Sequence, residues 1–254
     1  MHETESTPGT GSTPDAPAAA QKGTPFLERT GDVYILRLAG EGVVDDDARF
    51  HPDWIDAVHA ALDEVEAAEG PVALVTANTG KYYSNGLDLE YILPRMEQLD
   101  PYLDRVHTVF HRLVGFPAPT VAAVQGHAFG AGAMLATAHD FRVMRADRGF
   151  YCLPEVTLNM PFTPSMTALV SRRLPNQVAL EAMTTGRRYG GQDALAAGIV
   201  DTLVDGDGVL DAAVARAQEL APLHGKNLAG IKRGLHAELL EALAQKTVGT
   251  TVGG

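Results

Sequence analysis

The 254-residue sequence has little of what disulfide-bonded, membrane-spanning or nucleic-acid-binding proteins require. Its single cysteine, Cys152, excludes an internal disulfide and fits a reducing compartment. There is no run of 18 apolar residues, so we expect no membrane-spanning helix. Acidic residues outnumber basic ones by 32 to 20, a formal charge of −12, which argues against a nucleic-acid or anionic-membrane partner. The histidines show no metal-ligand spacing, so we expect no metal site.

The first 24 residues differ in composition from the rest of the chain. Residues 1–24 are rich in Thr, Pro, Gly and Ala and lack the basic start and hydrophobic core of a signal peptide. Such a segment buries too little apolar surface to offset its ordering entropy, so we expect a disordered tail. Hydrophobic residues make up 45% of the chain, enough for one sizeable core. Together these features predict a cytoplasmic protein.

After residue 25, short apolar β-branched runs alternate with amphipathic helical patterns. The predicted strands are 32–40, 72–76, 119–124, 141–144 and 150–153, and the predicted helices are 51–70, 96–113 and 131–138. This order predicts an α/β core of strand–strand–helix units with strands buried on both faces. From residue 165 the pattern is mostly helical, with helices at 166–173, 176–184, 192–197, 208–220 and 227–244 and a strand at 198–204.

Two apolar runs break into glycine at points where a helix can begin. They are 81–90 (KYYSNGLDLE) and 120–133 (TVAAVQGHAFGAGA). Such junctions leave backbone N–H groups unpaired, and two of them facing one carbonyl oxygen would form an oxyanion hole. Downstream lies Glu155, a carboxylate that follows Leu153 and Pro154. The pattern therefore predicts chemistry on an enolate.

The glycines of the second junction have two other interpretations. A dinucleotide-binding loop is disfavoured, because Gly126, Gly130 and Gly132 do not have the G-x-G-x-x-G spacing and no acidic residue ends a following strand at the position that this motif requires. Small residues at 128–133 would also let a helix pack closely against a strand. Such close packing is compatible with an oxyanion hole, since the close approach of the backbones and an exposed N–H require the same geometry.

Several of these segments resemble the crotonase, or enoyl-CoA hydratase/isomerase, superfamily. They are 73–89 (ALVTANTGKYYSNGLDL), 119–140 (PTVAAVQGHAFGAGAMLATAHD), 147–155 (DRGFYCLPE), 186–200 (GRRYGGQDALAAGIV) and 227–235 (NLAGIKRGL). The resemblance implies a crotonase-type spiral of strand–strand–helix units over 25–190 and a C-terminal helical region over 191–254 that covers the site or drives trimerisation. It also implies an acyl-CoA thioester substrate, no cofactor beyond that CoA, and a homotrimer or a dimer of trimers.

The resemblance also assigns roles to individual residues. The oxyanion-hole N–H groups would belong to Leu87 and Ala131, and Glu155 would be the catalytic base. The implied substrate- and CoA-binding residues are Ser84, Asn85, Gly86, Asp88, Leu89, Gly130 and Lys232. Of these, Asn85, Asp88 and Leu89 would line the adenine pocket largely through backbone groups, and Lys232 would contact a CoA phosphate.

One position separates the activities of this family. Hydratases carry a first glutamate where this sequence has Met134, whose thioether can neither accept a proton nor orient water as a base. The 3,2-enoyl-CoA isomerases retain only the glutamate that matches Glu155, and 144–155 (MRADRGFYCLPE) looks especially similar to their plant and actinobacterial branch. The sequence therefore predicts isomerisation of 3-enoyl-CoA to 2-trans-enoyl-CoA through a dienolate, in fatty-acid β-oxidation. Hydration of 2-enoyl-CoA, another crotonase reaction and a non-catalytic CoA-binding homologue are the alternatives.

Other polar residues near the motifs have structural interpretations. We expect His127 to point away from the reacting carbons, Cys152 to be a buried strand cysteine and Asp140 to make a buried structural hydrogen bond. Taken without the glycine junctions, Glu155 would be interpreted as a helix N-cap or a surface carboxylate, since most glutamates are solvated. Its apolar neighbours Leu153, Val156, Met160 and Phe162 are expected to keep the site dry and raise the carboxyl pKa toward neutrality.

Overall fold

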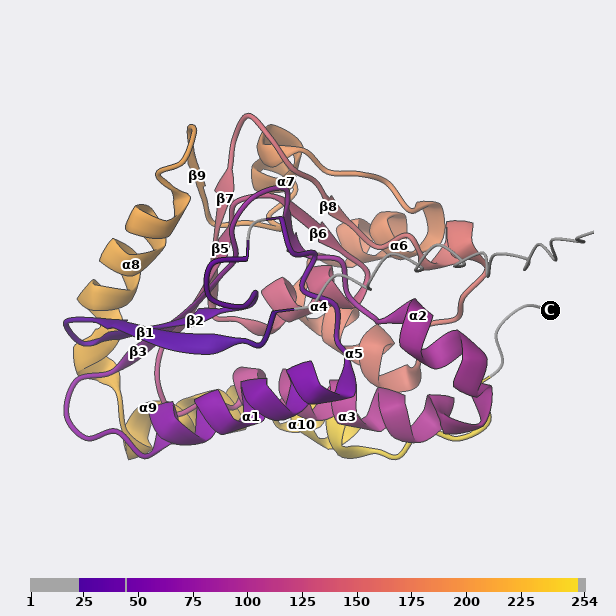
Figure 1. Ribbon diagram of the computed structural model, residues 1–254, viewed down its shortest axis with the longest axis horizontal. Helices are drawn as coiled ribbons and strands as arrows, with labels where there is room; N and C mark the ends of the chain where they lie inside the picture. Colours follow the sequence, from indigo (N-terminus) through magenta and orange to yellow (C-terminus); the bar gives the residue numbers. More distant parts are fainter. Residues whose placement is uncertain (1–22, 44, 251–254) are drawn as a thin grey trace, which may run out of the picture.

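The computed structural model describes residues 23–43 and 45–250. The strands form two sheets, and from β3 (Ala73–Ala77) onward the chain alternates between them, with helices on the outer faces (Figure 1). The disordered tail predicted for 1–24 lies outside the described residues except for Gly23 and Thr24. Among the described residues no helix combines the length and hydrophobicity that crossing a bilayer requires.

The larger sheet has six strands in the order β1-β2-β3-β5-β7-β9. They are β1 (Phe26–Thr30), β2 (Val33–Arg37), β3 (Ala73–Ala77), β5 (Thr120–Val124), β7 (Phe141–Arg145) and β9 (Thr202–Val204). Only the β1–β2 pair is antiparallel; the other neighbours are parallel. All five residues of β3 and of β5 are buried, as expected for parallel strands covered on both faces.

Alternate side chains of these strands enter two different cores. Val75 and Val121 pack with Ala213 and Ala217 of α8 (Val209–Leu220), which covers the left side of the sheet in Figure 1. Their neighbours, such as Leu74, point the other way into the main core. Small alanines on α8 let that helix lie close to the sheet, and the larger core on the opposite face holds the functional site.

The smaller sheet joins β4 (Tyr82–Ser84), β6 (His127–Phe129) and β8 (Tyr151–Cys152) in parallel. Each of its strands follows a strand of the larger sheet and precedes a helix, as in β5–β6–α4 (Ala131–Ala138) and β7–β8–η2 (Glu155–Leu158)–α5 (Pro164–Arg173). The predicted α/β spiral of strand–strand–helix units is therefore confirmed. The pattern analysis missed β4 and β6 because each has only three residues and lies inside a glycine junction.

The remaining elements are helical. They are α1 (Pro52–Glu66), α2 (Leu89–Ile92), η1 (Leu93–Gln98), α3 (Leu99–Val114), α6 (Asn176–Thr185), α7 (Gly191–Ala196), η3 (Ala221–Leu223), α9 (Lys226–Leu235) and α10 (Ala237–Ala244). The prediction of a single helix over 227–244 is wrong, because the helix is interrupted at His236, which separates α9 from α10. Lys232 ties α9 to Asp140, whereas Leu239 and Leu243 bury α10 against α3 and α5. One straight helix could not make both sets of contacts, so the segment is divided into two helices.

The boundary predicted at residue 190 divides two parts that share the larger sheet, since β9 and α8 come after it.

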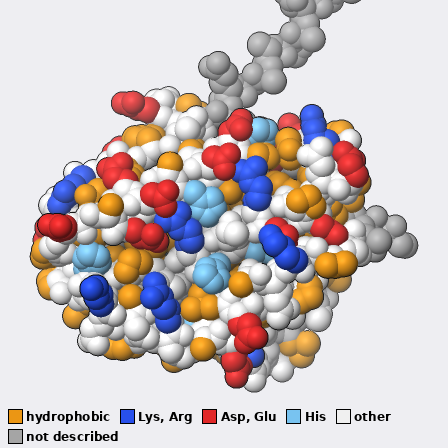
Figure 2. Space-filling model, turned by 90° about the horizontal axis from the view of Figure 1, so that it is seen from below, with side chains coloured by type: hydrophobic (Ala, Val, Ile, Leu, Met, Phe, Trp, Pro, Cys, Tyr) orange, Lys and Arg blue, Asp and Glu red, His pale blue; other side chains and the backbone are white. Residues whose placement is uncertain are grey.

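The face that carries α1, α3 and α10 mixes acidic and basic side chains (Figure 2). Part of that mixture consists of ion pairs between α3 and α1, namely Arg105–Asp56 at 2.5 Å and Arg112–Asp63 at 2.7 Å.

The first turn of α4 lies directly against β4. At Gly132, an added Cβ atom would collide with the backbone oxygen of Ser84. This position therefore requires glycine for close approach, although glycine in a helix is otherwise unfavourable. The approach brings the start of α4 beside the turn that follows β4.

Gly132→Ala is therefore expected to destabilise the protein by roughly 1–3 kcal/mol or more, because α4 must shift away from β4. Gly234→Ala in α9 is the matched control: nothing lies within 4 Å of its added Cβ, so it should stabilise the protein by up to about 1 kcal/mol. Urea unfolding of both variants measures the two effects. Equal effects would show that α4 does not depend on this contact.

Candidate active site

A cavity of about 460 Å³ brings together most of the residues predicted for the site. The predicted residues that line it are Asn85, Leu87, Leu89, Gly130, Ala131 and Glu155. They come from the turn after β4, the start of α4 and the start of η2, which are far apart in the sequence. Tertiary packing thus places both glycine junctions and the carboxylate around one space.

The two glycine junctions touch each other through their backbones. A Cβ atom on Gly86 would lie 2.8 Å from the Ala131 nitrogen and 3.0 Å from the Gly132 nitrogen. Both Gly86, with φ of 81°, and Gly130, with φ of 52°, have the left-handed backbone that favours glycine. Ala131 is the first residue of α4, so its N–H has no acceptor within the helix. Within residues 23–43 and 45–250, neither this N–H nor that of Leu87 donates to another protein group.

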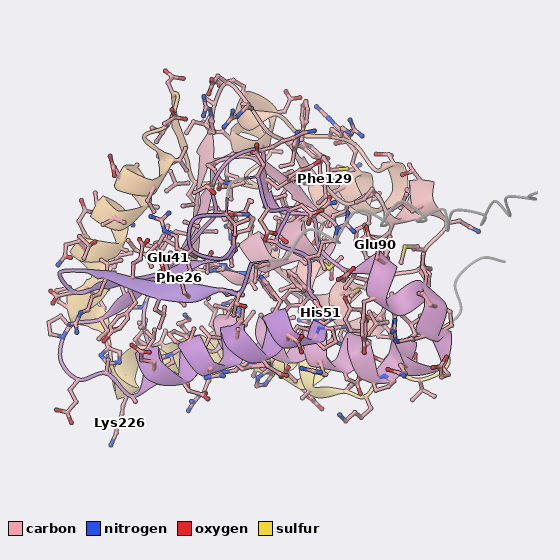
Figure 3. The ribbon with its side chains drawn as sticks, viewed as in Figure 1. Phe26, Glu41, His51, Glu90, Phe129 and Lys226 are labelled. Atoms are coloured by element: carbon pink, nitrogen blue, oxygen red, sulfur yellow. The ribbon has the colours of Figure 1, made fainter. Side chains whose placement is uncertain are left out.

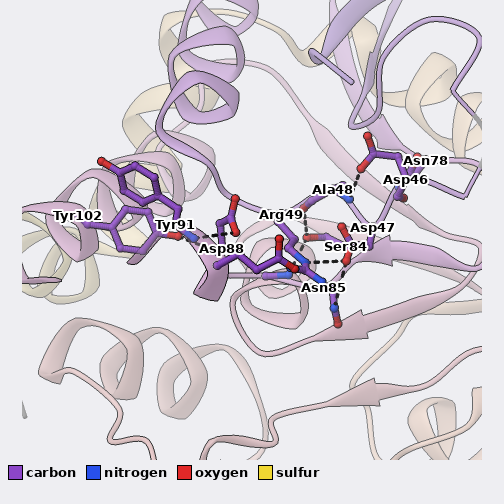
Figure 4. Close-up of polar contacts among 12 residues, drawn as sticks. Asp46, Asp47, Ala48, Arg49, Asn78, Ser84, Asn85, Asp88, Tyr91 and Tyr102 are labelled. Carbon is purple, nitrogen blue, oxygen red and sulfur yellow. Dashed lines mark hydrogen bonds and ion pairs between the residues drawn. The ribbon is translucent and has the colours of Figure 1, made fainter. Parts of the chain in front are cut away.

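The loop before α1 holds the turn after β4 in place (Figure 4). The Ser84 hydroxyl donates to the Ala48 carbonyl at 2.8 Å and accepts from the Gly86 N–H at 3.1 Å. The Asn85 N–H donates to the Asp47 carbonyl at 2.7 Å. Ser84 and Gly86 therefore shape the turn from behind rather than line the cavity.

Asp88 supports the same turn from the other side. Its carboxylate accepts from the Tyr91 N–H at 3.2 Å and caps α2, and its own N–H donates to the Tyr102 hydroxyl at 2.9 Å. The residue is fully buried and lines a neighbouring hollow with Arg49 and Trp54 instead of the main cavity. The structure thus places Asp88 in the supporting framework.

Glu155 begins η2 and points into the cavity. Its side chain lies against the second junction, because a Cβ on Gly130 would be 3.3 Å from Oε1. The residue is 9% exposed, and within the described part of the chain Oε2 is buried without a hydrogen-bond partner. Burial raises the pKa of this carboxyl to about 7, since the charged form loses hydration that a hydrogen bond from its own backbone only partly replaces.

The walls around Glu155 are mostly apolar, with Leu99 and Leu103 of α3 opposite η2. Met160 lines the cavity as expected, but Val156 is 48% exposed and the prediction that it shields the site is wrong. Side chains three residues apart superpose in a 3₁₀ turn, so Leu158 shares the side of Glu155 and Val156 points outward. Among the predicted neighbours, Leu153 is buried beneath the turn and Phe162 packs at the edge of the core.

The polar end of the cavity was not predicted. Arg49 and Glu90 line it and form an ion pair at 2.6 Å, and Arg49 also pairs with Asp47 at 2.7 Å. Glu90 and Phe129, both of which line the cavity, lie in the same part of the molecule, while Lys226 is at the opposite end (Figure 3). Arg49 carries no local motif, and it reaches the site through the bridge between Arg49 and Gly86 and the hydrogen bonds of its neighbours to the turn after β4.

Met134, His127 and Cys152, which the sequence analysis interpreted as structural residues, each pack within the fold. Met134 is fully buried in the main core and does not line the cavity. The His127 ring stacks on the Phe150 ring with 5.5 Å between their centroids. Burial lowers the pKa of His127, and the positive charge of Lys81 lowers it further. The Cys152 thiol donates to the Gly186 carbonyl, and burial raises its pKa, so it is not an activated nucleophile.

Lys232 is not in a position to bind a CoA phosphate, and this assignment needs correction. Its ammonium is buried and donates to Asp140 Oδ2 at 2.8 Å, and it does not line the cavity. The same carboxylate oxygen of Asp140 accepts from the Thr120 N–H at 2.9 Å, so Asp140 makes the structural hydrogen bond predicted for it. The pair joins α9 to the residue before β7 of the larger sheet. The Lys232 ammonium there balances the charge of the largely buried Asp140 carboxylate.

Comparison with known proteins finds a matching family model and similar sequences and structures. Residues 49–250 match the sequence model of the family described as enoyl-CoA hydratase/isomerase. The chain is 35% identical to enoyl-CoA delta isomerase 3 of Arabidopsis thaliana, with 84% of this chain and 92% of that protein covered. It is 32% identical to peroxisomal enoyl-CoA delta isomerase 2 of the same plant, with coverage of 87% and 95%. The crystal structure of an enoyl-CoA hydratase from Mycobacterium marinum superposes with a TM-score of 0.78 at 27% identity, covering 87% of this chain and 95% of that one.

The raised pKa of Glu155 has a consequence for stability. Between its ordinary pKa of 4.5 and about 7 the folded state binds this proton more tightly than the unfolded state, so stability falls as pH rises through this range. The loss amounts to at most about 3 kcal/mol. Glu155→Gln cannot ionise, so it should be more stable than the wild type at pH 8 but not at pH 5. Urea unfolding at both pH values gives the difference, and a gap that does not change with pH would contradict the burial argument.

The buried Lys232–Asp140 pair predicts an effect on stability rather than on binding. Lys232→Met leaves a largely buried carboxylate without its cation, which should cost roughly 3 kcal/mol. Lys226→Met removes an exposed lysine from the start of the same helix and should be nearly neutral. Denaturant unfolding tests the stability of both variants, and acyl-CoA titration tests binding. A Lys232 variant that folds stably but binds CoA weakly would restore the phosphate assignment.

Proposed function

Because the chain belongs to the enoyl-CoA hydratase/isomerase family, we propose that it isomerises 3-enoyl-CoA to 2-trans-enoyl-CoA. Support comes from two relatives named as enoyl-CoA delta isomerases, each matched over more than nine-tenths of its length. CoA enters as part of the thioester, and the reaction needs no further cofactor since one side chain carries the proton. Its place in β-oxidation, a cytoplasmic location and a homotrimer or dimer of trimers remain predictions from the sequence.

The substrate would bind with its thioester oxygen between the N–H groups of Leu87 and Ala131. Both groups are free of protein acceptors within the described residues, and the Ala131 N–H starts a helix. Positioned N–H groups stabilise negative charge on oxygen more strongly as an enolate forms, and one such donor contributes roughly 3–4 kcal/mol to lowering the barrier. This arrangement would favour the dienolate over the bound thioester.

Glu155 would then relay a proton between two carbons. Its carboxylate takes a proton from the α carbon, which is acidified by the carbonyl and by the adjacent alkene. The electron pair moves into a dienolate, and the same carboxyl returns the proton to the γ carbon, so that the double bond becomes conjugated. The pKa of about 7 suits a group that must first accept and then donate.

One observation carries the choice of isomerase over hydratase: Glu155 lies in the cavity while Met134 is sealed in the core. The other acid that lines the cavity among the described residues, Glu90, is exposed and paired with Arg49. A single carboxyl is enough to shuttle a proton, whereas the hydratases of this family hold their water with two.

A pair of substrates separates the activities directly. With 3-hexenoyl-CoA, we expect the absorbance of the conjugated thioester to grow. With crotonyl-CoA, we expect that absorbance to stay constant, whereas a hydratase would deplete it rapidly. Binding of both thioesters without any change would indicate the non-catalytic homologue.

Glu155→Gln is expected to lower kcat of the isomerisation by roughly 10²–10⁴-fold, because the amide cannot accept a proton. In the wild type, kcat/KM should rise as pH increases through about 7, since the base acts in its ionised form. Glu64→Gln on the outer face of α1 is a control for loss of a surface charge and should leave both quantities unchanged. Full activity in the Glu155 variant would remove this residue from the mechanism.

A further inference from the structure

Residues 247–250, here called the strap, follow α10 and cross the beginning of α3. The Thr247 N–H donates to Asp104 Oδ1 at 2.8 Å. The Gly249 and Thr250 N–H groups donate to the two oxygens of Asp100, at 2.7 and 3.2 Å. Hydrogen bonds to ionised carboxylates are stronger than those between neutral groups. Two side chains one helical turn apart thus hold three backbone groups of the strap.

The local conformation of the strap fits this attachment. Gly249 has φ of 70°, a left-handed backbone that turns two successive N–H groups toward one carboxylate. Val248 between the attachments is 87% exposed, so its side chain points away from the protein, whereas Thr247 and Thr250 are half-buried. The strap therefore has a distinct inner side.

The inner side of the strap forms part of the wall of the cavity described above. Thr250 lines the cavity together with Leu99 and Leu103 of α3. Asp100 follows Leu99 in this helix, so one turn of α3 presents apolar side chains to the cavity and a carboxylate to the strap. In Figure 1 the chain after α10 runs along the lower edge of the molecule to the first turns of α3. Arg49 and Glu90 provide the polar part of the lining, and Thr250 joins the apolar part.

We propose that the strap closes the apolar part of the cavity and sets the length of acyl chain that the protein accepts. This inference rests on the proposed acyl-CoA function. An acyl chain longer than the closed space must displace Thr250 and break the bonds to Asp100, whereas a shorter chain leaves them intact. Asp100 is thus a positioning residue that acts through the strap, and Thr250 is the wall itself.

Two substitutions with opposite expected effects test this proposal. Asp100→Ala removes both acceptors for Gly249 and Thr250 and should raise the affinity for dodecanoyl-CoA relative to hexanoyl-CoA by roughly tenfold, the scale on which the fit of an apolar group discriminates. Thr250→Trp enlarges the wall and should lower the same ratio. Val248→Ala, on the outer side of the strap, should leave it unchanged. If Asp100→Ala fails to fold, Asp100→Asn, which keeps the side-chain volume, should shift the ratio in the same direction by a smaller factor.

Equilibrium titration with these saturated thioesters requires no turnover, so it separates the two proposals. Opposite shifts of the affinity ratio in the Asp100 and Thr250 variants support the strap even in a protein that isomerises nothing. Ratios within twofold of the wild type in both variants overturn the strap, even if 3-hexenoyl-CoA is isomerised at full rate. A shift in the same direction for both variants also overturns it, because a wall that is opened and a wall that is enlarged must act oppositely.

Discussion

The contact between two stretches of backbone, at Gly86 and at the start of α4, is the constraint on which the site depends. No Cβ fits at Gly86 or Gly132, so the turn after β4 and the first residues of α4 meet without side chains between them. This contact places the N–H groups of Leu87 and Ala131 beside one cavity. The unusual backbone of Gly86 and Gly130 is retained because neighbouring elements fix both ends of each junction.

Glu155 shows how such a site differs from the rest of the core. Most buried polar groups of the protein have partners: His139, for example, bonds to Thr76 and to the Leu135 carbonyl on its two ring nitrogens. Glu155 has one oxygen without a partner among the described residues, and burial raises the pKa of its carboxyl to about 7. The protein loses stability by keeping this carboxyl in an apolar wall, and the same desolvation gives it the pKa that the proposed base requires.

Two connections tie the C-terminal part of the chain to this site. The buried Lys232–Asp140 pair fixes α9 at the edge of the larger sheet, and α10 packs on α3 and α5. These contacts direct residues 247–250 over the carboxylates of α3, where Thr250 reaches the cavity. The C-terminal helices thus contribute to the cavity through the position they give to the segment after them.

The sequence alone was enough to predict the α/β core and both glycine junctions, and its resemblance to a known family added the spiral, the role of Glu155 and the meaning of Met134. These features are local: apolar runs have a period, glycines mark special backbone, and a motif has a fixed spacing. Arg49 and Thr250 carry no such signal, and the sequence placed Lys232 at the wrong partner. Which side chains meet across 90 or more residues depends on how helices pack, as when Lys232 meets Asp140, 92 residues away, instead of a phosphate. The sequence therefore determined the chemistry available to this protein, while only the tertiary structure decided which groups surround the cavity, because a charge or an apolar side chain takes its role from its neighbours in space.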